Sequence, residues 1–291
     1  MIRIWWETIR PKTLIAGASP VILGSALAFH DGYFTPVIAG VTLFCALMLQ
    51  IAANFANDYF DFIGGADTPD RLGPRRMLPA GLISKRQMVQ GMVVVFTAAL
   101  ISGAYLTIVG GRIVFFIGIL AMLMSVFYTA GPIKLGYIGL GEAAAFLFFG
   151  PVAAAGTYYL QAETVGFEVL LLSVSPGLFA LALLTVNNYR DRAEDMRSGK
   201  KTLAVRYGAV FARTLYSISL VSAFVIPCLL VFSKKIGFSV CFPPLLVGIS
   251  VPVLHKLRKQ PPGKWLNKVL GATGLFEALA TAGITLALTL S

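Results

Sequence analysis

Long apolar stretches follow one another along almost the whole chain, and they decide what it can fold into. The sequence has 291 residues, of which 57% are hydrophobic and only 13% charged, and its mean hydropathy is +0.80. A transmembrane helix needs about 20 consecutive, mainly apolar residues. Approximate spans of this kind lie at 13–30, 35–57, 87–109, 112–130, 138–160, 166–187, 211–233, 236–255 and 267–290. The sequence therefore predicts a polytopic membrane protein with about nine transmembrane helices.

The predicted architecture is all-α. Backbone polar groups in lipid must be satisfied within the structure, which leaves helices or closed β-barrels. The apolar stretches lack the alternation of polar and apolar residues that barrel strands require. We expect one transmembrane domain over 1–291, with two weakly similar halves at about 13–130 and 138–255 and a last span at 267–290. Its helices are expected to surround a central cavity that opens to the cytoplasmic side.

The basic residues are distributed very unevenly between the two sides of the membrane. Of the 24 Lys and Arg residues, 21 lie in the N-terminal segment, in the loops after the second, fourth, sixth and eighth spans, or in the first three residues of the spans that follow these loops. Cytoplasmic loops carry such an excess, so the N-terminus should be cytoplasmic and the protein should lie in a bacterial cytoplasmic membrane. The net charge of +11 is then a topology signal, and we expect the lipid bilayer and no nucleic acid as a partner.

Cysteine and histidine offer no zinc site. Cys45, Cys228 and Cys241 lie inside apolar stretches, and His30 and His255 are isolated at the ends of such stretches. Their spacing matches neither a disulfide framework nor a set of metal ligands. Any metal site must therefore depend on oxygen ligands.

Two acidic clusters provide such ligands, and we expect both in loops. The first follows the second span and reads Asn57-Asp58-Tyr59-Phe60-Asp61, then Gly64-Gly65-Ala66-Asp67; the second follows the sixth span and reads Asn187-Asn188-Tyr189-Arg190-Asp191, then Glu194-Asp195. Carboxylates at the mouth of a membrane bundle are costly, so they indicate a functional site. If the second segment is helical, its two spaced Asp residues share one face, with an Asn one turn earlier. The first cluster begins with the same Asn-to-Asp spacing.

Carboxylate and amide oxygens are ligands that suit Mg²⁺, which also recruits substrate phosphates. The predicted metal ligands are Asn57, Asp61, Asp67, Asp191 and Asp195. A single charged loop is more often only a solvated face, but two matching clusters make that interpretation much weaker. We expect Asp58, Asp70 and Glu194 to be solvated or to support the ligands.

Basic residues follow both clusters and could hold the phosphate groups of a substrate. The predicted diphosphate contacts are Arg71, Arg75, Arg76, Lys134, Lys200 and Lys201, with the amides of Asn57 and Asn187 beside them. Arg can bind phosphate oxygens in bidentate fashion. The alternative for Lys200 and Lys201 is that they serve only as topology determinants.

Together these motifs resemble the UbiA superfamily of intramembrane prenyltransferases. The family's two motifs stand here at Asn57, Asp61 and Asp67 and at Asp191 and Asp195. The resemblance extends over nearly the whole chain, through Arg10-Pro11-Lys12-Thr13-Leu14, Ser125-x-x-Tyr128, Gly131-Pro132-Ile133-Lys134-Leu135, Gly139-Leu140-Gly141-Glu142 and Gly199-Lys200-Lys201-Thr202-Leu203-Ala204. Each segment is a weak signal alone, but their order and spacing are specific.

The resemblance implies Mg²⁺-dependent transfer of a polyprenyl group from its diphosphate to an aromatic acid. It implies catalytic roles for Asp61, Asp67, Asp191 and Asp195, and Tyr128 could stabilise the allylic cation by a cation–π contact. Five residues separate Asp61 from Asp67, a spacing that resembles the menaquinone branch. The expected acceptor is 1,4-dihydroxy-2-naphthoate, which would lose its carboxyl group.

Other functions stay open from the sequence. A related prenyltransferase could act on another aromatic or lipid acceptor. A secondary transporter is the main alternative that is not an enzyme, although transporter sites tend to lie near the membrane midplane. A membrane phosphotransferase with a single Asp cluster is a further alternative, but its Asp-Gly and Ala-Arg signature is missing.

Overall fold

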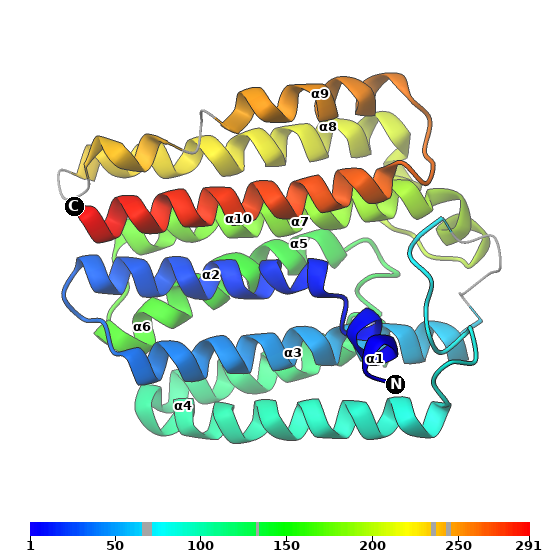
Figure 1. The fold of residues 1–291 in the computed structure, drawn as a ribbon, viewed down its shortest axis with the longest axis horizontal. Coiled ribbons are helices and arrows are strands. Elements are labelled where there is room, and N and C mark those ends of the chain that lie inside the picture. Colours follow the sequence, from blue (N-terminus) through cyan, green and yellow to red (C-terminus); the bar gives the residue numbers. More distant parts are fainter. Residues whose placement is uncertain (66–71, 132–133, 234–236, 243–245) are drawn as a thin grey trace.

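The structure is a computed structural model that describes residues 1–291 apart from 66–71, 132–133, 234–236 and 243–245. The described part is helical and contains α1 (Ile2–Ile9), α2 (Pro11–His30), α3 (Pro36–Ile63), α4 (Lys85–Phe127), α5 (Gly141–Leu147), the π-helix η1 (Phe148–Ala155), α6 (Gly156–Ala162), α7 (Phe167–Arg197), α8 (Leu203–Val225), the 3₁₀ helices η2 (Ile226–Ser233) and η3 (Phe238–Cys241), α9 (Val247–Lys259) and α10 (Leu266–Leu290). The long helices lie side by side as one bundle, and the two termini lie at opposite ends of it (Figure 1). This confirms the all-α, polytopic architecture.

Seven helical segments of the described part are long and apolar enough to cross a membrane. One of them, α4, is 43 residues long and contains two predicted spans, because its helix is interrupted at Gly111. Gly111 has φ 69° and ψ −156°, a conformation that only glycine adopts easily. The chain folds back there into two antiparallel arms (Figure 1). The break falls between the spans predicted at 87–109 and 112–130.

The last helices before α10 agree less closely with the predicted spans. The span predicted at 211–233 begins earlier, because α8 starts at Leu203 and continues into η2. Of the span predicted at 236–255, the structure describes η3 and α9, which is 13 residues long. Pro252 lies inside α9, and α9 ends in a basic turn that sequence hydropathy alone would exclude from a span.

The expectation that the acidic clusters lie in loops is wrong for Asn57 to Asp61 and for Asn187 to Asp195, and Asp67 lies outside the described residues. Helix α3 continues past the predicted end at 57 to Ile63, and α7 continues past 187 to Arg197. Neither extension contains Gly or Pro, so nothing in its sequence breaks the helix. After each helix the chain turns at a glycine with positive φ, Gly65 (67°) after α3 and Gly199 (76°) after α7. Asp58 and Asp61 therefore lie at the end of α3, and Asp191, Glu194 and Asp195 at the end of α7.

Close backbone packing fixes α7 against the segment from α5 to η1. A Cβ atom added to Gly177 would lie 2.6 Å from the Phe146 carbonyl oxygen, and one added to Gly150 would lie 2.7 Å from the Ser173 carbonyl oxygen. Only glycine permits this approach. As a result, the acidic end of α7 has a fixed position relative to the start of α5.

Candidate active site

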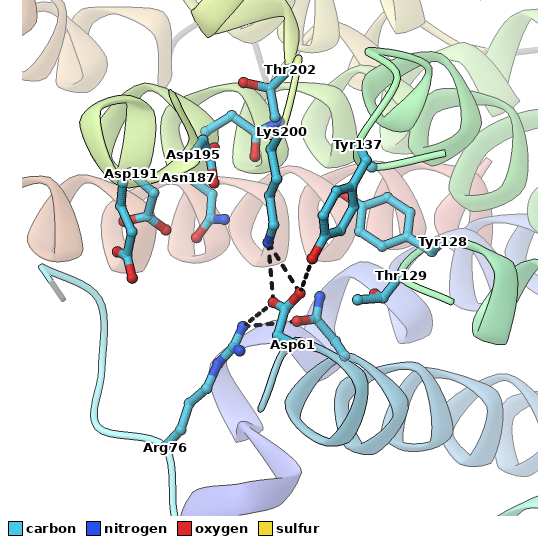
Figure 2. A pocket seen from close by; sticks show the side chains of 14 residues that line it. Asp61, Arg76, Tyr128, Thr129, Tyr137, Asn187, Asp191, Asp195, Lys200 and Thr202 are labelled. Atoms are coloured by element: carbon cyan, nitrogen blue, oxygen red, sulfur yellow. Dashed lines mark hydrogen bonds and ion pairs between the residues drawn. The ribbon is translucent and has the colours of Figure 1, made fainter. Parts of the chain in front are cut away.

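Described residues of both acidic clusters line one polar cavity at the end of the bundle where the N-terminus lies. Figure 2 shows its side chains converging from α3, α7 and the loops around them. The lining residues are Asn57, Asp61, Arg76, Tyr128, Thr129, Gly136, Tyr137, Asn187, Asn188, Asp191, Glu194, Asp195, Lys200 and Thr202. Residues more than a hundred positions apart in the sequence thus form one site.

Asp61 is the centre of the charged network in this cavity. Its side chain is only 2% exposed and accepts hydrogen bonds from Arg76 Nη2 at 2.9 Å and from Lys200 Nζ at 3.1 and 3.2 Å. Arg76 Nη2 also donates to the Asn57 amide oxygen at 2.8 Å. The two cations stabilise the carboxylate in a place where an unpaired charge would be very costly.

Asp58 is not solvated, contrary to one of the two expectations for it. It is 1% exposed and pairs with Arg10 and, at 3.0 Å, with Arg76 Nε. Arg10 joins α1 to α2 with a left-handed φ of 58°, which is uncommon for a residue other than glycine. This ion pair connects the start of α2 to the cavity end of α3.

The second cluster is organised by a buried arginine. Arg190 is 2% exposed; its Nε and Nη2 donate to the two Asp191 oxygens at 2.7 and 2.6 Å, and Nη2 also donates to the Asn187 oxygen at 2.8 Å. Its Nη1 donates to Asn267 of α10 at 2.8 Å. Asn267 in turn donates to the Leu72 carbonyl oxygen at 2.9 Å. This chain of contacts joins α7 and α10 to the segment after the first cluster.

Tyr137 lines the cavity, although the sequence analysis assigns it no role. Its hydroxyl donates to Asp61 Oδ1 at 2.9 Å. The ammonium groups of Lys200 and Lys134 lie 4.7 and 5.1 Å from its ring centroid, within cation–π distance. Burial and the neighbouring Asp61 carboxylate raise the pKa of the Tyr137 hydroxyl, so the group stays a hydrogen-bond donor. Its only sequence signal is a tyrosine three residues after Lys134.

The predicted basic residues divide into two groups. Arg76 and Lys200 line the cavity, whereas Arg75, Lys134 and Lys201 are exposed and do not line it. Lys134 still contacts the cavity through the Tyr137 ring, and the Lys201 backbone N–H donates to the Tyr137 carbonyl oxygen at 2.8 Å.

Two predicted site residues, Asp67 and Arg71, lie outside the described residues. The other predicted metal ligands, Asn57, Asp61, Asp191 and Asp195, all line the cavity. Asp191 and Asp195 are one helical turn apart on α7, as their spacing predicts, and Figure 2 shows both beside Asn187.

The oxygen ligands suit a magnesium ion that is shared with a substrate. Within the described part of the chain, no group of three or more His, Cys, Asp and Glu side chains is placed to hold a metal ion. Mg²⁺ needs no such closed cage, because it usually takes one or two carboxylates and completes its shell with waters and substrate phosphates. Carboxylates on two separate helix ends, facing one cavity, fit that mode of binding.

The family follows from comparison with known proteins. The UbiA prenyltransferase family matches residues 18–276. The chain belongs to the UbiA prenyltransferase family. It is therefore a prenyltransferase and an integral membrane protein, which argues against the transporter alternative.

Relatives within the UbiA family support the same assignment. The 1,4-dihydroxy-2-naphthoate octaprenyltransferase of Escherichia coli is 37% identical over 235 residues, which cover 79% of this chain and 76% of that protein. The enzyme of the same name from Mycobacterium tuberculosis is 34% identical, covering 96% of this chain and 95% of that protein. A UbiA homologue from Archaeoglobus fulgidus, solved with GPP and Mg²⁺, has a TM-score of 0.68 at 15% identity and covers 99% of this chain and 100% of that chain. That likeness shows a shared fold.

Proposed function

We propose that this UbiA prenyltransferase transfers a polyprenyl group from its diphosphate to 1,4-dihydroxy-2-naphthoate, with loss of the carboxyl group, in menaquinone biosynthesis. The observation that carries the proposal is the meeting of Asp61 with Asp191 and Asp195 in one cavity that also holds Arg76 and Lys200. Two acidic helix ends and two cations together fit a diphosphate with its metal ions. The acceptor is proposed from the relatives, whose names specify the same naphthoate.

The diphosphate would lie among these charged groups. Asn57, Asp61, Asp67, Asp191 and Asp195 would hold Mg²⁺, which when bound would draw charge onto the leaving diphosphate. Arg76 and Lys200, now paired with Asp61, would turn to the phosphate oxygens, and the Asn187 amide lies beside them. Arg71 is proposed to assist them. The exposed Arg75, Lys134 and Lys201 would attract the anionic substrates to the cavity.

The reaction then needs an electron-rich wall for the prenyl cation. The bond between C1 of the prenyl chain and the diphosphate oxygen breaks, and its electron pair leaves with the diphosphate. Tyr128, which lines the cavity, would stabilise the allylic cation through its ring. The ring carbon that carries the carboxylate forms the new bond to C1, and the carboxyl group leaves as CO₂ and returns its electron pair to the ring. Charge and atoms balance without a separate proton acceptor.

The location of the site agrees with the chemistry of the substrates. The prenyl tail is apolar and belongs in the bilayer, whereas the diphosphate and the naphthoate are anions that must enter from water. We place the cavity at the cytoplasmic face of a bacterial cytoplasmic membrane because the basic residues gather at that end of the bundle.

The proposed reaction can be tested with purified protein. It should be incubated with Mg²⁺, a long prenyl diphosphate and, in separate samples, 1,4-dihydroxy-2-naphthoate or 4-hydroxybenzoate, and the products should be identified by mass. Prenylated naphthol with release of CO₂ is the expected product, and EDTA should stop its formation. Prenylation of 4-hydroxybenzoate with its carboxyl group retained, and none of the naphthoate, would show that the enzyme acts on another acceptor.

A further inference from the structure

A buried carboxylate behind the cavity has no part in the mechanism above. Glu142, in the first turn of α5, is only 2% exposed. Its Oε1 accepts a hydrogen bond from the Asn188 side-chain nitrogen at 2.8 Å, and its Oε2 has no hydrogen-bond partner among the described residues. A buried carboxyl oxygen without a partner is costly, so its retention needs a reason.

Helix packing holds this pair of residues in place. Asn188 lies on α7 three turns beyond Gly177, the residue that contacts the backbone of the α5 to η1 segment. Glu142 lies at the start of α5, one turn before Phe146. The backbone contact at Gly177 holds α5 and α7 together, and the hydrogen bond between Glu142 and Asn188 joins the same two helices at the cavity.

The chemistry of the pair fixes the orientation of the Asn188 amide. In the structure the NH₂ group of Asn188 donates to the Glu142 carboxyl group, so this end of the amide faces Glu142. Its carbonyl oxygen is then left for the cavity, which Asn188 lines. Without Glu142, either end of the amide could face the substrates.

Tyr128 and Thr129 line the cavity on the side of Tyr137, and Figure 2 shows both apart from Asp191 and Asp195. A Cβ atom added to Gly141, the neighbour of Glu142, would lie 3.0 Å from the Tyr128 hydroxyl oxygen. The start of α5 thus contacts Tyr128 through Gly141 and Asn188 through Glu142, and we treat Tyr128 and Asn188 as one wall of the cavity.

Such a wall selects its ligand by hydrogen-bond type. Phosphate oxygens are acceptors and anionic, so an amide oxygen in front of a carboxylate repels them. A phenolic hydroxyl donates a hydrogen bond and is neutral, so it fits this wall well. The aromatic acceptor carries such hydroxyl groups, and the diphosphate does not.

We propose that Glu142 is a positioning residue for the aromatic acceptor: it orients Asn188 so that the amide oxygen accepts a hydrogen bond from a ring hydroxyl, beside the Tyr128 hydroxyl. The inference rests on the proposed function. It assigns the α5 side of the cavity to the acceptor and leaves the diphosphate to the charged side.

The test compares Glu142→Gln with Asn188→Ala and with the double variant, using Glu163→Gln as the matched control. Glu163 is exposed at the far end of α6. In Glu142→Gln the amide of residue 142 can donate to the Asn188 oxygen, so the orientation is lost. The KM for the naphthoate should rise about tenfold, which corresponds to about 1.4 kcal/mol. The KM for the prenyl diphosphate and the Mg²⁺ concentration for half-maximal rate should stay unchanged.

Two further readouts separate positioning from a structural role. In the Asn188→Ala background, Glu142→Gln should add little, because both changes remove the same interaction. The affinity for the naphthoate can be measured in the absence of prenyl diphosphate from the fluorescence of the naphthoate. This affinity should be lower in Glu142→Gln and in Asn188→Ala than in the wild type, and it should be unchanged in Glu163→Gln.

Several outcomes would overturn the inference. These are an unchanged naphthoate KM in folded Glu142→Gln, equal losses for both substrates, fully additive effects of the two changes, or a shift in Mg²⁺ dependence alone, which would make Asn188 a metal ligand. If Glu142→Gln does not fold, Asn188→Ala by itself must raise the naphthoate KM. Wild-type protein that does not prenylate the naphthoate at all would instead contradict the proposed function.

Discussion

Lys200 and Asp61 are 139 residues apart in the sequence, and their side chains form an ion pair with an N–O distance of 3.1 Å inside the cavity. This contact joins the loop after α7 to the end of α3. The same carboxylate also binds Arg76 and Tyr137, so three separate segments meet at one residue (Figure 2).

Removal of the Lys200 ammonium should weaken use of the prenyl diphosphate. A lost hydrogen bond to a charged group typically costs about 1.5–3 kcal/mol, so Lys200→Ala should raise the KM for the diphosphate roughly ten- to a hundred-fold. Lys201→Ala is the matched control, because Lys201 is exposed and does not line the cavity. Steady-state kinetics with both substrates would measure the difference. Equal effects of the two changes would mean that Lys200 acts only through the overall charge of the loop.

Arg76 should be needed for stability as well as for substrate binding. Its side chain is 6% exposed and pairs with both Asp58 and Asp61, so Arg76→Ala leaves two buried carboxylates short of a cation. Removing one partner of a buried ion pair typically costs about 3–5 kcal/mol. Thermal unfolding should show a clearly lower Tm for Arg76→Ala, and almost no change for Arg75→Ala, whose side chain is exposed. A wild-type Tm in Arg76→Ala would contradict the importance of this network.

Tyr137 should contribute through its hydroxyl and through its ring. Tyr137→Phe removes the hydrogen bond to Asp61 but keeps the ring below Lys200, so we expect a loss in kcat/KM of up to about tenfold. Tyr137→Leu removes both interactions and should cost more. Because the raised pKa keeps the hydroxyl protonated, wild-type activity should not fall through ionisation of Tyr137 below pH 10. Identical kinetics for the Phe and Leu variants would exclude a role for the ring.

Cysteine labelling can test the orientation of the bundle. In a background without Cys45, Cys228 and Cys241, the Ser198→Cys variant should react with a membrane-impermeant reagent only after the cells are opened. The Thr164→Cys variant should react in intact cells, because Thr164 is exposed at the other end of the bundle, between α6 and α7. Labelling of residue 198 from outside would reverse the proposed topology.

The sequence predicts the helices of this fold well because membrane burial depends on average hydropathy. For that reason hydropathy predicts a boundary between the spans that end at 109 and begin at 112, and the helix is interrupted there, at Gly111. The predicted ends of α3 and α7 are wrong because both helices continue beyond the apolar layer. A hydropathy pattern detects the membrane boundary, and it does not detect where hydrogen bonding along the helix stops.

The composition of the site could be predicted only in part. The matching spacing of Asn57 and Asp61 with Asn187 and Asp191 was enough to single out both clusters. Which side chain of a cluster faces the cavity depends on helix rotation, so the buried pairing of Asp58 was not visible. The sequence analysis assigns no role to Tyr137 or to Glu142, although Glu142 stands in one of the segments of the resemblance, because their partners lie 76 and 46 positions away in the sequence.

The central claim is that one Asp from each helix end acts on the same substrate in the same cavity. It is tested most directly by the rate of prenyl transfer to 1,4-dihydroxy-2-naphthoate, at saturating Mg²⁺, in Asp61→Asn and in Asp191→Asn. Asp31→Asn is the control, since Asp31 follows the opposite end of α2. We predict that Asp61→Asn and Asp191→Asn each lose at least about a hundredfold in rate, a barrier increase of about 2.7 kcal/mol, while the activity of Asp31→Asn is retained. Both variants should stay folded, because Asn still accepts hydrogen bonds from Arg76 or Arg190, although the lost charge should lower their Tm. Near wild-type rates in both Asp61→Asn and Asp191→Asn would contradict the account.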